Sequence, residues 1–173
     1  MKKVILFLAI TLIIVIIGIS SYANISVGNT KHYDNGTIAF DYPGNLSIQT
    51  GQNEINIEDS SYNGCSILFT EYPSESTLNN GTSDKQMNFE AYMNNFIFED
   101  ADIIEKNKIT ISGRSAYNVS ERIPEGIVQY ATYIDFELGV FAITHNVDVS
   151  IQDQRTTPDY KAYETVVNSF QIK

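Results

Sequence analysis

Short segments in which apolar and polar residues alternate recur along most of this chain. Alternation with a period of two is typical of strands that bury one face. The strand-like segments are residues 37–42, 46–48, 55–57, 65–69, 108–111, 115–119, 127–136 and 140–147. The segment 65–69 is more continuously apolar, which predicts an interior strand. Two hairpins are predicted among the last four segments. The first joins 108–111 to 115–119 through Ser112-Gly113, and the second joins 127–136 to 140–147 through Glu137-Leu138-Gly139.

Only two stretches show the spacing of an amphipathic helix. Asn88 precedes the first as a cap, and Thr157-Pro158 starts the second with Thr as cap and Pro at the first position. The faces predicted to pack inward are Phe89, Tyr92, Met93 and Phe96 in the first helix, and Tyr160, Tyr163, Val167 and Phe170 in the second. Several strands, a helix, about four strands and a terminal helix predict an α+β sandwich, in which helices cover one face or the ends of an antiparallel sheet.

The N-terminus has the pattern of an export signal. Lys2 and Lys3 precede an uncharged apolar segment from Val4 to Ile19. Two interpretations remain open: a signal peptide cleaved after Ala23, or an uncleaved membrane anchor whose about 16 apolar residues would span roughly 24 Å of the ~30 Å hydrocarbon core. Either way we expect an extracytoplasmic protein, with 1–23 as signal peptide or anchor, 24–32 as a tether and 33–173 as one domain.

Charge and cysteine content exclude some classes of function. The chain has 11 basic and 21 acidic side chains, a net charge of −10. That balance argues against nucleic acid as a partner, because such binding depends on Lys and Arg neutralising phosphates. It also argues against a peripheral hold on anionic lipid, so any membrane contact is expected through the N-terminal segment. The single Cys65 can form no internal disulfide and is predicted to be a small core residue.

Three segments together resemble the PsbP-like family, named for the extrinsic protein of the photosynthetic oxygen-evolving complex. They are YDNGTIAFDYP at 33–43, similar to the family's G-I-x-F-x-Y-P start, ITISGRSAY at 109–117, similar to its I-x-G-x-x-A hairpin, and YETVVNSFQI at 163–172, similar to its helix and S-F ending. Leu46 stands where the family usually has tryptophan. The resemblance implies an α-β-α-like sandwich on an antiparallel sheet, a role in assisting assemblies, and no catalytic residues to carry over.

Few residues of this chain have the types and spacing that chemistry requires. The two histidines are His32, in the predicted tether, and His145, which alternates with Phe141 and Ile143 and is predicted to be a satisfied core or edge histidine. The chain has no third histidine, no cysteine pair and no nucleophile motif, so neither a zinc or copper site nor a hydrolase is expected.

An acidic cluster is the metal candidate. Glu99, Asp100, Asp102 and Glu105 follow the first predicted helix, and their oxygens could hold Ca²⁺ or Mn²⁺. The segment lacks the alternating ligands and central glycine of a calcium loop, so a solvated acidic turn is the alternative interpretation.

Glycosylation is a further hypothesis. Five Asn-x-Ser/Thr sequons occur, at Asn24, Asn35, Asn45, Asn80 and Asn118.

The function predicted from these observations is a non-enzymatic, extracytoplasmic accessory or interaction module of the PsbP-like type. Its partner would be an unknown protein or an envelope component, and no cofactor and no nucleic acid are expected. The alternative is a protein that binds a small ligand or a divalent cation, using the acidic turn or a pocket on a sheet face. An exposed aromatic patch would favour the interaction module. A pocket that gathers His145 with an acidic residue would favour an enzyme.

Overall fold

The computed structural model describes residues 29–58, 64–73, 87–151 and 154–173. The segment from Val4 to Ile19, with its two interpretations, lies outside these residues. Within the described ranges, no helix is long and apolar enough to cross a membrane.

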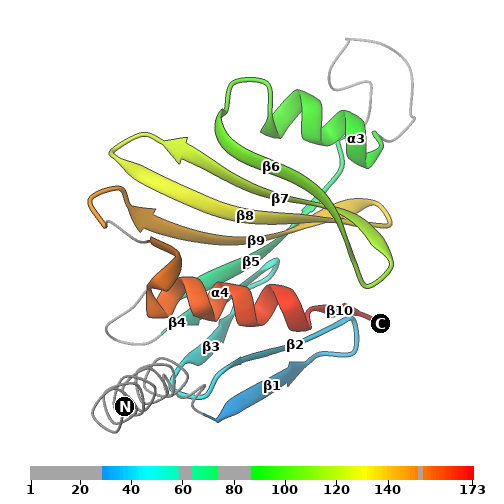
Figure 1. The fold of residues 1–173 in the computed structure, drawn as a ribbon. Coiled ribbons are helices and arrows are strands. Elements are labelled where there is room, and N and C mark those ends of the chain that lie inside the picture. Colours follow the sequence, from blue (N-terminus) through cyan, green and yellow to red (C-terminus); the bar gives the residue numbers. More distant parts are fainter. Residues whose placement is uncertain (1–28, 59–63, 74–86, 152–153) are drawn as a thin grey trace, which may run out of the picture.

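A large antiparallel sheet forms the centre of the molecule (Figure 1). Its seven strands run in the order β3-β4-β5-β9-β8-β7-β6. Their bounds are β3 Ser47–Thr50, β4 Glu54–Glu58, β5 Cys65–Glu71, β6 Asp102–Ile111, β7 Arg114–Ile123, β8 Ile127–Phe136 and β9 Gly139–Asp148. Neighbours in the sequence mostly pair as hairpins, and β5 pairs with β9 in the middle of the sheet. Both predicted hairpins and the predicted interior strand are therefore confirmed.

One face of this sheet, called the α4 face below, is covered by a helix and a small sheet. Helix α4 (Pro158–Ser169) starts as predicted, because the Thr157 hydroxyl accepts a hydrogen bond from the Tyr160 N–H at 3.1 Å. The 3₁₀ turn η2 (Gln154–Thr156) precedes it. Strands β1 (Thr30–Asp34), β2 (Ile38–Pro43) and β10 (Gln171–Ile172) form the small sheet in the order β1-β2-β10. Helix α4 contacts β2, β5 and β9, and so lies between the two sheets.

The opposite face, called the α3 face, carries a shorter helical segment. Helix α3 (Phe89–Tyr92) is capped by Asn88, whose Oδ1 accepts from the Ala91 N–H at 2.9 Å. It continues into a π-helical turn, η1 (Met93–Ile97), in which the Phe98 N–H donates to the Met93 carbonyl at 2.9 Å. The prediction that Phe96 packs inward is wrong, because Phe96 is 46% exposed. The wider i→i+5 turn rotates Phe96 off the face, and Ile97 and Phe98 pack against the core instead.

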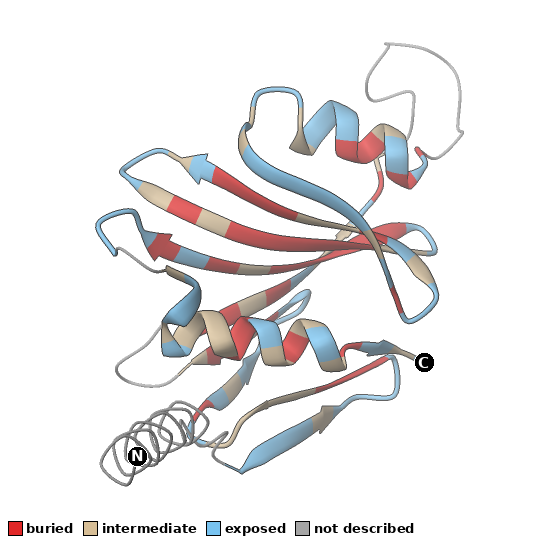
Figure 2. Cartoon of the chain, viewed as in Figure 1, coloured by how far each residue is buried: buried red, intermediate tan, exposed pale blue. Residues whose placement is uncertain are grey.

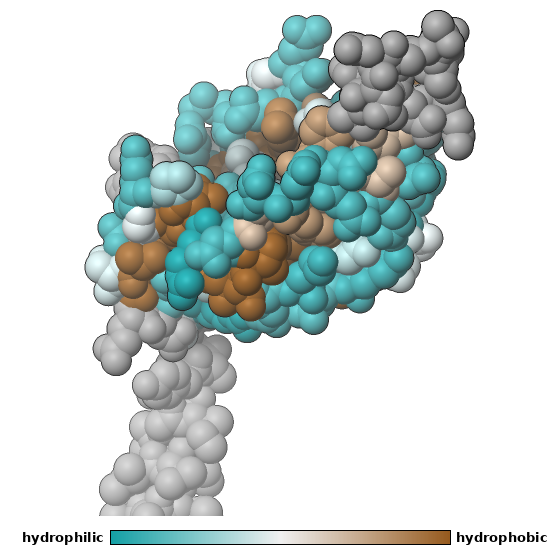
Figure 3. Space-filling view, turned by 90° about the horizontal axis from the view of Figure 1, so that it is seen from above, coloured by the Kyte–Doolittle hydropathy of each residue, from teal (hydrophilic) through white to brown (hydrophobic). Residues whose placement is uncertain are grey.

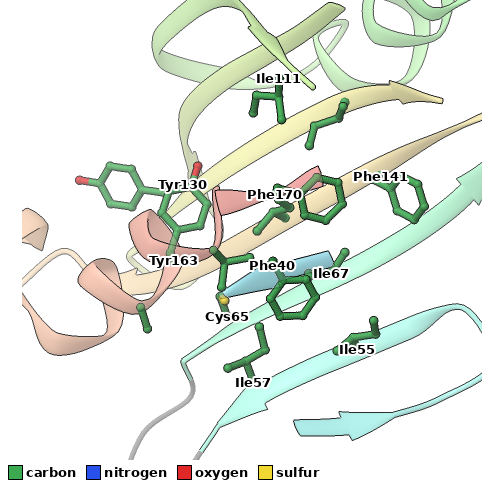
Figure 4. Close-up of a cluster of buried hydrophobic side chains, with 14 of the residues drawn as sticks. Phe40, Ile55, Ile57, Cys65, Ile67, Ile111, Tyr130, Phe141, Tyr163 and Phe170 are labelled. Carbon is green, nitrogen blue, oxygen red and sulfur yellow. The ribbon is translucent and has the colours of Figure 1, made fainter. Parts of the chain in front are cut away.

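The sheet separates two hydrophobic clusters (Figure 2). The larger lies on the α4 face, where Figure 4 shows Phe40 beside Ile67 and Cys65 and below Phe170. Phe40 is fully buried and stacks on Tyr33 and Phe170, with ring centroids 4.9 and 6.3 Å apart. Cys65 is a free, buried thiol whose pKa is raised by burial, as a small core residue requires. These contacts join β2 and α4 to the large sheet.

Two predicted boundaries differ from the structure. The first strand begins at Thr30, so residues 30–32 belong to the small sheet and not to a tether. There His32 faces Asp41 across the β1–β2 pair, with Nδ1 2.7 Å from Oδ1. Strand β6 begins at Asp102, six residues before the predicted start at 108. Strand β6 is the edge of the sheet, and residues 104–108 are all exposed. This part of the strand therefore does not alternate between buried apolar and exposed polar residues, and the sequence pattern did not indicate it.

Candidate functional site

A cavity of about 270 Å³ opens between the small sheet and the α4 face of the large sheet. Its floor comes from the large sheet, with Ile55 of β4, Ile67 and Phe69 of β5, Phe136 of β8 and Phe141 of β9. Tyr33 and Ile38 of the small sheet form the opposite wall. The mouth lies between the β1–β2 turn at 35–37 and the β3–β4 turn at 50–54. The cavity therefore depends on how the two sheets are positioned against each other.

Three phenylalanine rings make the floor aromatic. Phe69 and Phe141 have ring centroids 5.1 Å apart, Phe136 and Phe141 5.1 Å, and Phe69 and Phe136 6.0 Å. Their planes are inclined by 44° to 77° to one another, which offers an incoming group both ring edges and ring faces. The Arg114 guanidinium lies 5.8 Å from the centre of the Phe136 ring, a cation–π contact.

A close approach between two strands fixes one of these rings. A Cβ at Gly139 would lie 2.7 Å from the Phe69 ring and 2.5 Å from the Thr70 carbonyl oxygen. Gly139 begins β9 and pairs with Glu71 of β5, so the ring lies directly against its backbone. The absence of a side chain at Gly139 is therefore what lets Phe69 reach the cavity.

Apart from Glu54, the residues at the mouth have uncharged side chains. Asn35 closes its turn by accepting the N–H groups of Thr37 and Ile38 at 3.0 and 2.9 Å, and Gly36 takes the positive φ of 86° that the turn needs. The other turn is closed by the Gly51 N–H, which donates to the Glu54 carbonyl at 2.7 Å. Amides and hydroxyls at the two turns belong to Asn35, Thr37, Thr50, Gln52 and Asn53.

Strand register separates the cavity side of the β3–β4 hairpin from its opposite side. Thr50 pairs with Ile55, a floor residue, so the Thr50 side chain is on the cavity side. Gln49 precedes it and pairs with Asn56, so the Gln49 side chain is on the α3 face. Glu54 pairs with Leu68 and also belongs to the α3 face, so its side chain projects from the side of the sheet opposite the cavity floor.

His145 lies in the core beside α4, away from this cavity. It is 2% exposed, and its ring stacks near Tyr163 at a centroid distance of 6.3 Å. Nδ1 lies 2.7 Å from the Gly64 carbonyl, which can only accept, so Nδ1 carries the hydrogen. Nε2 is buried with no hydrogen-bond partner among the described residues. The predicted core position is confirmed, but only one of the two ring nitrogens is satisfied.

A second cavity, of about 230 Å³, includes His145 and Glu58 in its lining. Thr144 and Asn56 belong to the α3 face, and Glu58 shares that face because it alternates with Asn56 along β4. His145 is on the α4 face and pairs with Tyr130. The histidine and the carboxylate therefore project from opposite sides of the sheet, and they do not form the pair that would favour an enzyme.

The burial of His145, with its Nε2 unpaired among the described residues, makes the free energy of unfolding depend on pH. Burial lowers the pKa of His145 below its usual value of 6.5, so the unfolded chain binds the proton more readily than the folded chain. The contribution of His145 to stability is therefore complete above the unfolded pKa and is lost as the pH falls below about 6.5. Urea unfolding of the wild type and of His145→Phe between about pH 7.5 and about pH 5 should give a steeper loss in the wild type. Two parallel curves would contradict this.

The acidic segment does not form a metal site. Asp102 lies on edge strand β6 with its Oδ2 3.5 Å from Arg122, and Glu105 lies on the same strand with its Oε2 2.5 Å from Arg155. Glu99 and Asp100 precede the strand. Across the described ranges, no group of three or more His, Cys, Asp or Glu side chains could hold a metal ion. Because β6 is extended, Asp102 and Glu105 lie apart and each pairs with a different arginine. A turn would have brought the two carboxylates together.

The predicted sequons lie in different environments. Asn35 and Asn45 are exposed, whereas Asn118 is half-buried within β7, which has neighbours on both sides. Asn24 and Asn80 lie outside the described residues. Glycosylation of Asn35 and Asn45 stays a prediction.

The α3 face also exposes apolar side chains. Phe96 of η1 and Leu68 of β5 are 46% and 44% exposed, and Figure 3 shows apolar surface among hydrophilic side chains on this side of the molecule. Phe96 stacks on Tyr92, with ring centroids 5.4 Å apart. Exposed apolar patches of this kind are often contact surfaces.

Sequence reasoning missed the cavity with the phenylalanine floor. The alternation in 127–136 and 140–147 could have placed Phe136 and Phe141 on an inward face. Nothing local indicated that the β1–β2 turn would lie opposite the β3–β4 turn, because that arrangement depends on the packing of one sheet against the other.

Comparisons with known proteins identify the fold. No protein-family model matches this sequence, and no curated protein matches it. The structure does match the solution structure of cyanobacterial PsbP (CyanoP) from Synechocystis sp. PCC 6803, with a TM-score of 0.53 and 13% sequence identity, over 87% of this chain and 96% of that chain. The fold is PsbP-like. The predicted α+β class and the PsbP-like fold that the resemblance implied are both confirmed, while an identity this low transfers no function.

Proposed function

We propose that this PsbP-like chain is a non-enzymatic accessory module that works outside the cytoplasm and recognises a protein or an envelope component. The observation that carries the proposal is the cavity between the two sheets, which has an aromatic floor and mostly amide and hydroxyl side chains at its mouth. Recognition sites are typically concave and mostly apolar, with a few polar groups that orient the bound group. The described residues of its lining include no histidine or cysteine, which supports binding over catalysis.

Two further observations support an accessory role. The exposed Phe96 and Leu68 give the α3 face an apolar surface in addition to the cavity. The extracytoplasmic location is inferred from Lys2, Lys3 and the apolar segment that follows them. Because the net charge is −10, a partner with an acidic surface is disfavoured.

Cross-linking in intact cells tests this proposal. A photoreactive benzoylphenylalanine placed at Gln52, at the mouth, should form an adduct with the partner, and the same group at Gln49, on the opposite face, should not. Thr50→Trp, which places a large side chain at the mouth, should abolish the adduct. Equal adducts from both positions, or an adduct that survives Thr50→Trp, would contradict recognition through the cavity.

The same cavity supports a second candidate function, the binding of a free small ligand. A volume of about 270 Å³ suits a single ring or side chain and is below the usual range for drug-sized ligands. Binding of a small molecule by the purified chain, without any cross-linked macromolecule in cells, would favour this second function.

A further inference from the structure

We propose that the cavity binds an uncharged aromatic ring that carries one hydrogen-bonding group, such as a phenol. This inference rests on the proposed function and specifies the chemistry of the bound group. Three properties of the cavity lead to it: the arrangement of the floor rings, the neutrality of the mouth, and the volume.

The floor favours a flat ring over a flexible chain. Phe69, Phe136 and Phe141 are inclined to one another, so a ring that enters the cavity meets edges and faces in the tilted and edge-to-face geometries that aromatic pairs prefer. Tyr33 adds an aromatic side chain on the opposite wall. An alkyl chain would bury similar area without the ring–ring attraction, and it would lose rotamer freedom on binding.

The mouth favours a neutral group. Its amide and hydroxyl side chains can donate or accept a hydrogen bond but cannot neutralise an ion. Two acidic residues lie at or beside the mouth. The side chain of Glu54 projects from the α3 face, and the carboxylate of Asp34 forms an ion pair with Lys173. A charged group would lose hydration on entry without gaining a partner.

The volume limits the size of the ring. A closed apolar cavity of about 150 Å³ is enough for benzene, so about 270 Å³ has room for one ring and a small substituent. The hydrogen-bonding substituent would point toward the two turns, since the apolar side chains form the floor. A free phenol and the aromatic side chain of a partner protein share this chemistry.

Fluorine NMR on the full chain in lipid nanodiscs tests the proposal. The probes are 4-fluorophenol, 6-fluorohexan-1-ol, 4-fluorobenzoate and 2-deoxy-2-fluoroglucose, and empty nanodiscs correct for partition into lipid. We expect 4-fluorophenol to bind about tenfold more tightly than the alcohol, which corresponds to about 1.4 kcal/mol, and the benzoate and the sugar to bind more weakly still. Thr50→Trp should remove the binding of 4-fluorophenol, and the matched variant Gln49→Trp should keep it.

The outcomes separate this inference from the proposed function. Preference for the alcohol, the benzoate or the sugar, with the same loss in Thr50→Trp, would overturn the aromatic assignment and leave a binding cavity. No binding by any probe, combined with no cross-link from Gln52, would overturn both. N-acetyl-3-fluorotyrosine amide, which keeps the phenol group, distinguishes the two sources, because its binding as tightly as 4-fluorophenol would indicate a protein side chain, and its exclusion would indicate a free small molecule.

Discussion

Phe40→Ala is expected to lower the free energy of unfolding by about 3–5 kcal/mol, a large share of the stability of a typical domain. Phe40 is fully buried, and its ring contacts side chains from three parts of the fold: Tyr33 of β1, Tyr42 of β2 and Phe170 at the end of α4. The loss combines the transfer free energy of the ring with the cavity it leaves, because two sheets and a helix cannot all close in on one empty position.

Urea unfolding of the full chain, followed by far-ultraviolet circular dichroism, measures this effect. Phe96→Ala is the matched control, since it removes the same side chain from a position that is 46% exposed. We expect the control to lose less than about 1 kcal/mol. Similar losses in the two variants would show that Phe40 does not hold the small sheet and α4 to the large sheet.

Gly139→Ala is expected to cost about 1–3 kcal/mol and to weaken binding in the cavity. The new Cβ would lie 2.5 Å from the Thr70 carbonyl oxygen and 2.7 Å from the Phe69 ring. The carbonyl belongs to Thr70 of β5, which pairs with Val140 of β9, so the strain falls on the β5–β9 pair and on the ring. Displacement of Phe69 then removes one of the three floor rings.

The control for this prediction is Gly51→Ala. Its nearest new contact would be 3.6 Å from the Glu54 carbonyl, an ordinary van der Waals distance, so we expect a change within about 0.5 kcal/mol. Urea unfolding is measured on both variants, and 4-fluorophenol binding is measured on Gly139→Ala and the wild type. Unchanged stability and unchanged binding in Gly139→Ala would mean that the close approach at Phe69 is not a constraint.

Local signals predicted most of the fold. Asn88 and Thr157 mark the starts of the two helices because a side-chain oxygen before a helix satisfies a free N–H, and both caps are formed. Ser112-Gly113 marks a hairpin because both residues adopt positive φ, 49° and 75°. Each of these signals depends on residues a few positions apart, which sequence reasoning can examine directly.

The misses have a common physical cause, which is that the deciding interactions are absent from the local pattern. Phe96 fits an α-helical stripe, and only the π-helical turn moves it outward. The acidic residues at 102 and 105 look like a turn because an exposed edge strand needs no apolar alternation. Tyr33 and Phe141 both line the cavity. They are far apart in the sequence, so no local sequence pattern indicates that they lie close together.

The pairing of β10 with β2 makes one wall of the cavity depend on two segments that are far apart in the sequence. Gln171 and Ile172 pair with Ala39 and Ile38, and the Lys173 N–H donates to the Thr37 carbonyl at 2.9 Å, next to the mouth. Synthesis proceeds from the N-terminus, so β1 and β2 are made well before β10, the strand that completes their sheet. The small sheet beside the cavity is therefore complete only after β10 has been synthesised, so this wall of the cavity forms later than the hairpins of the large sheet can.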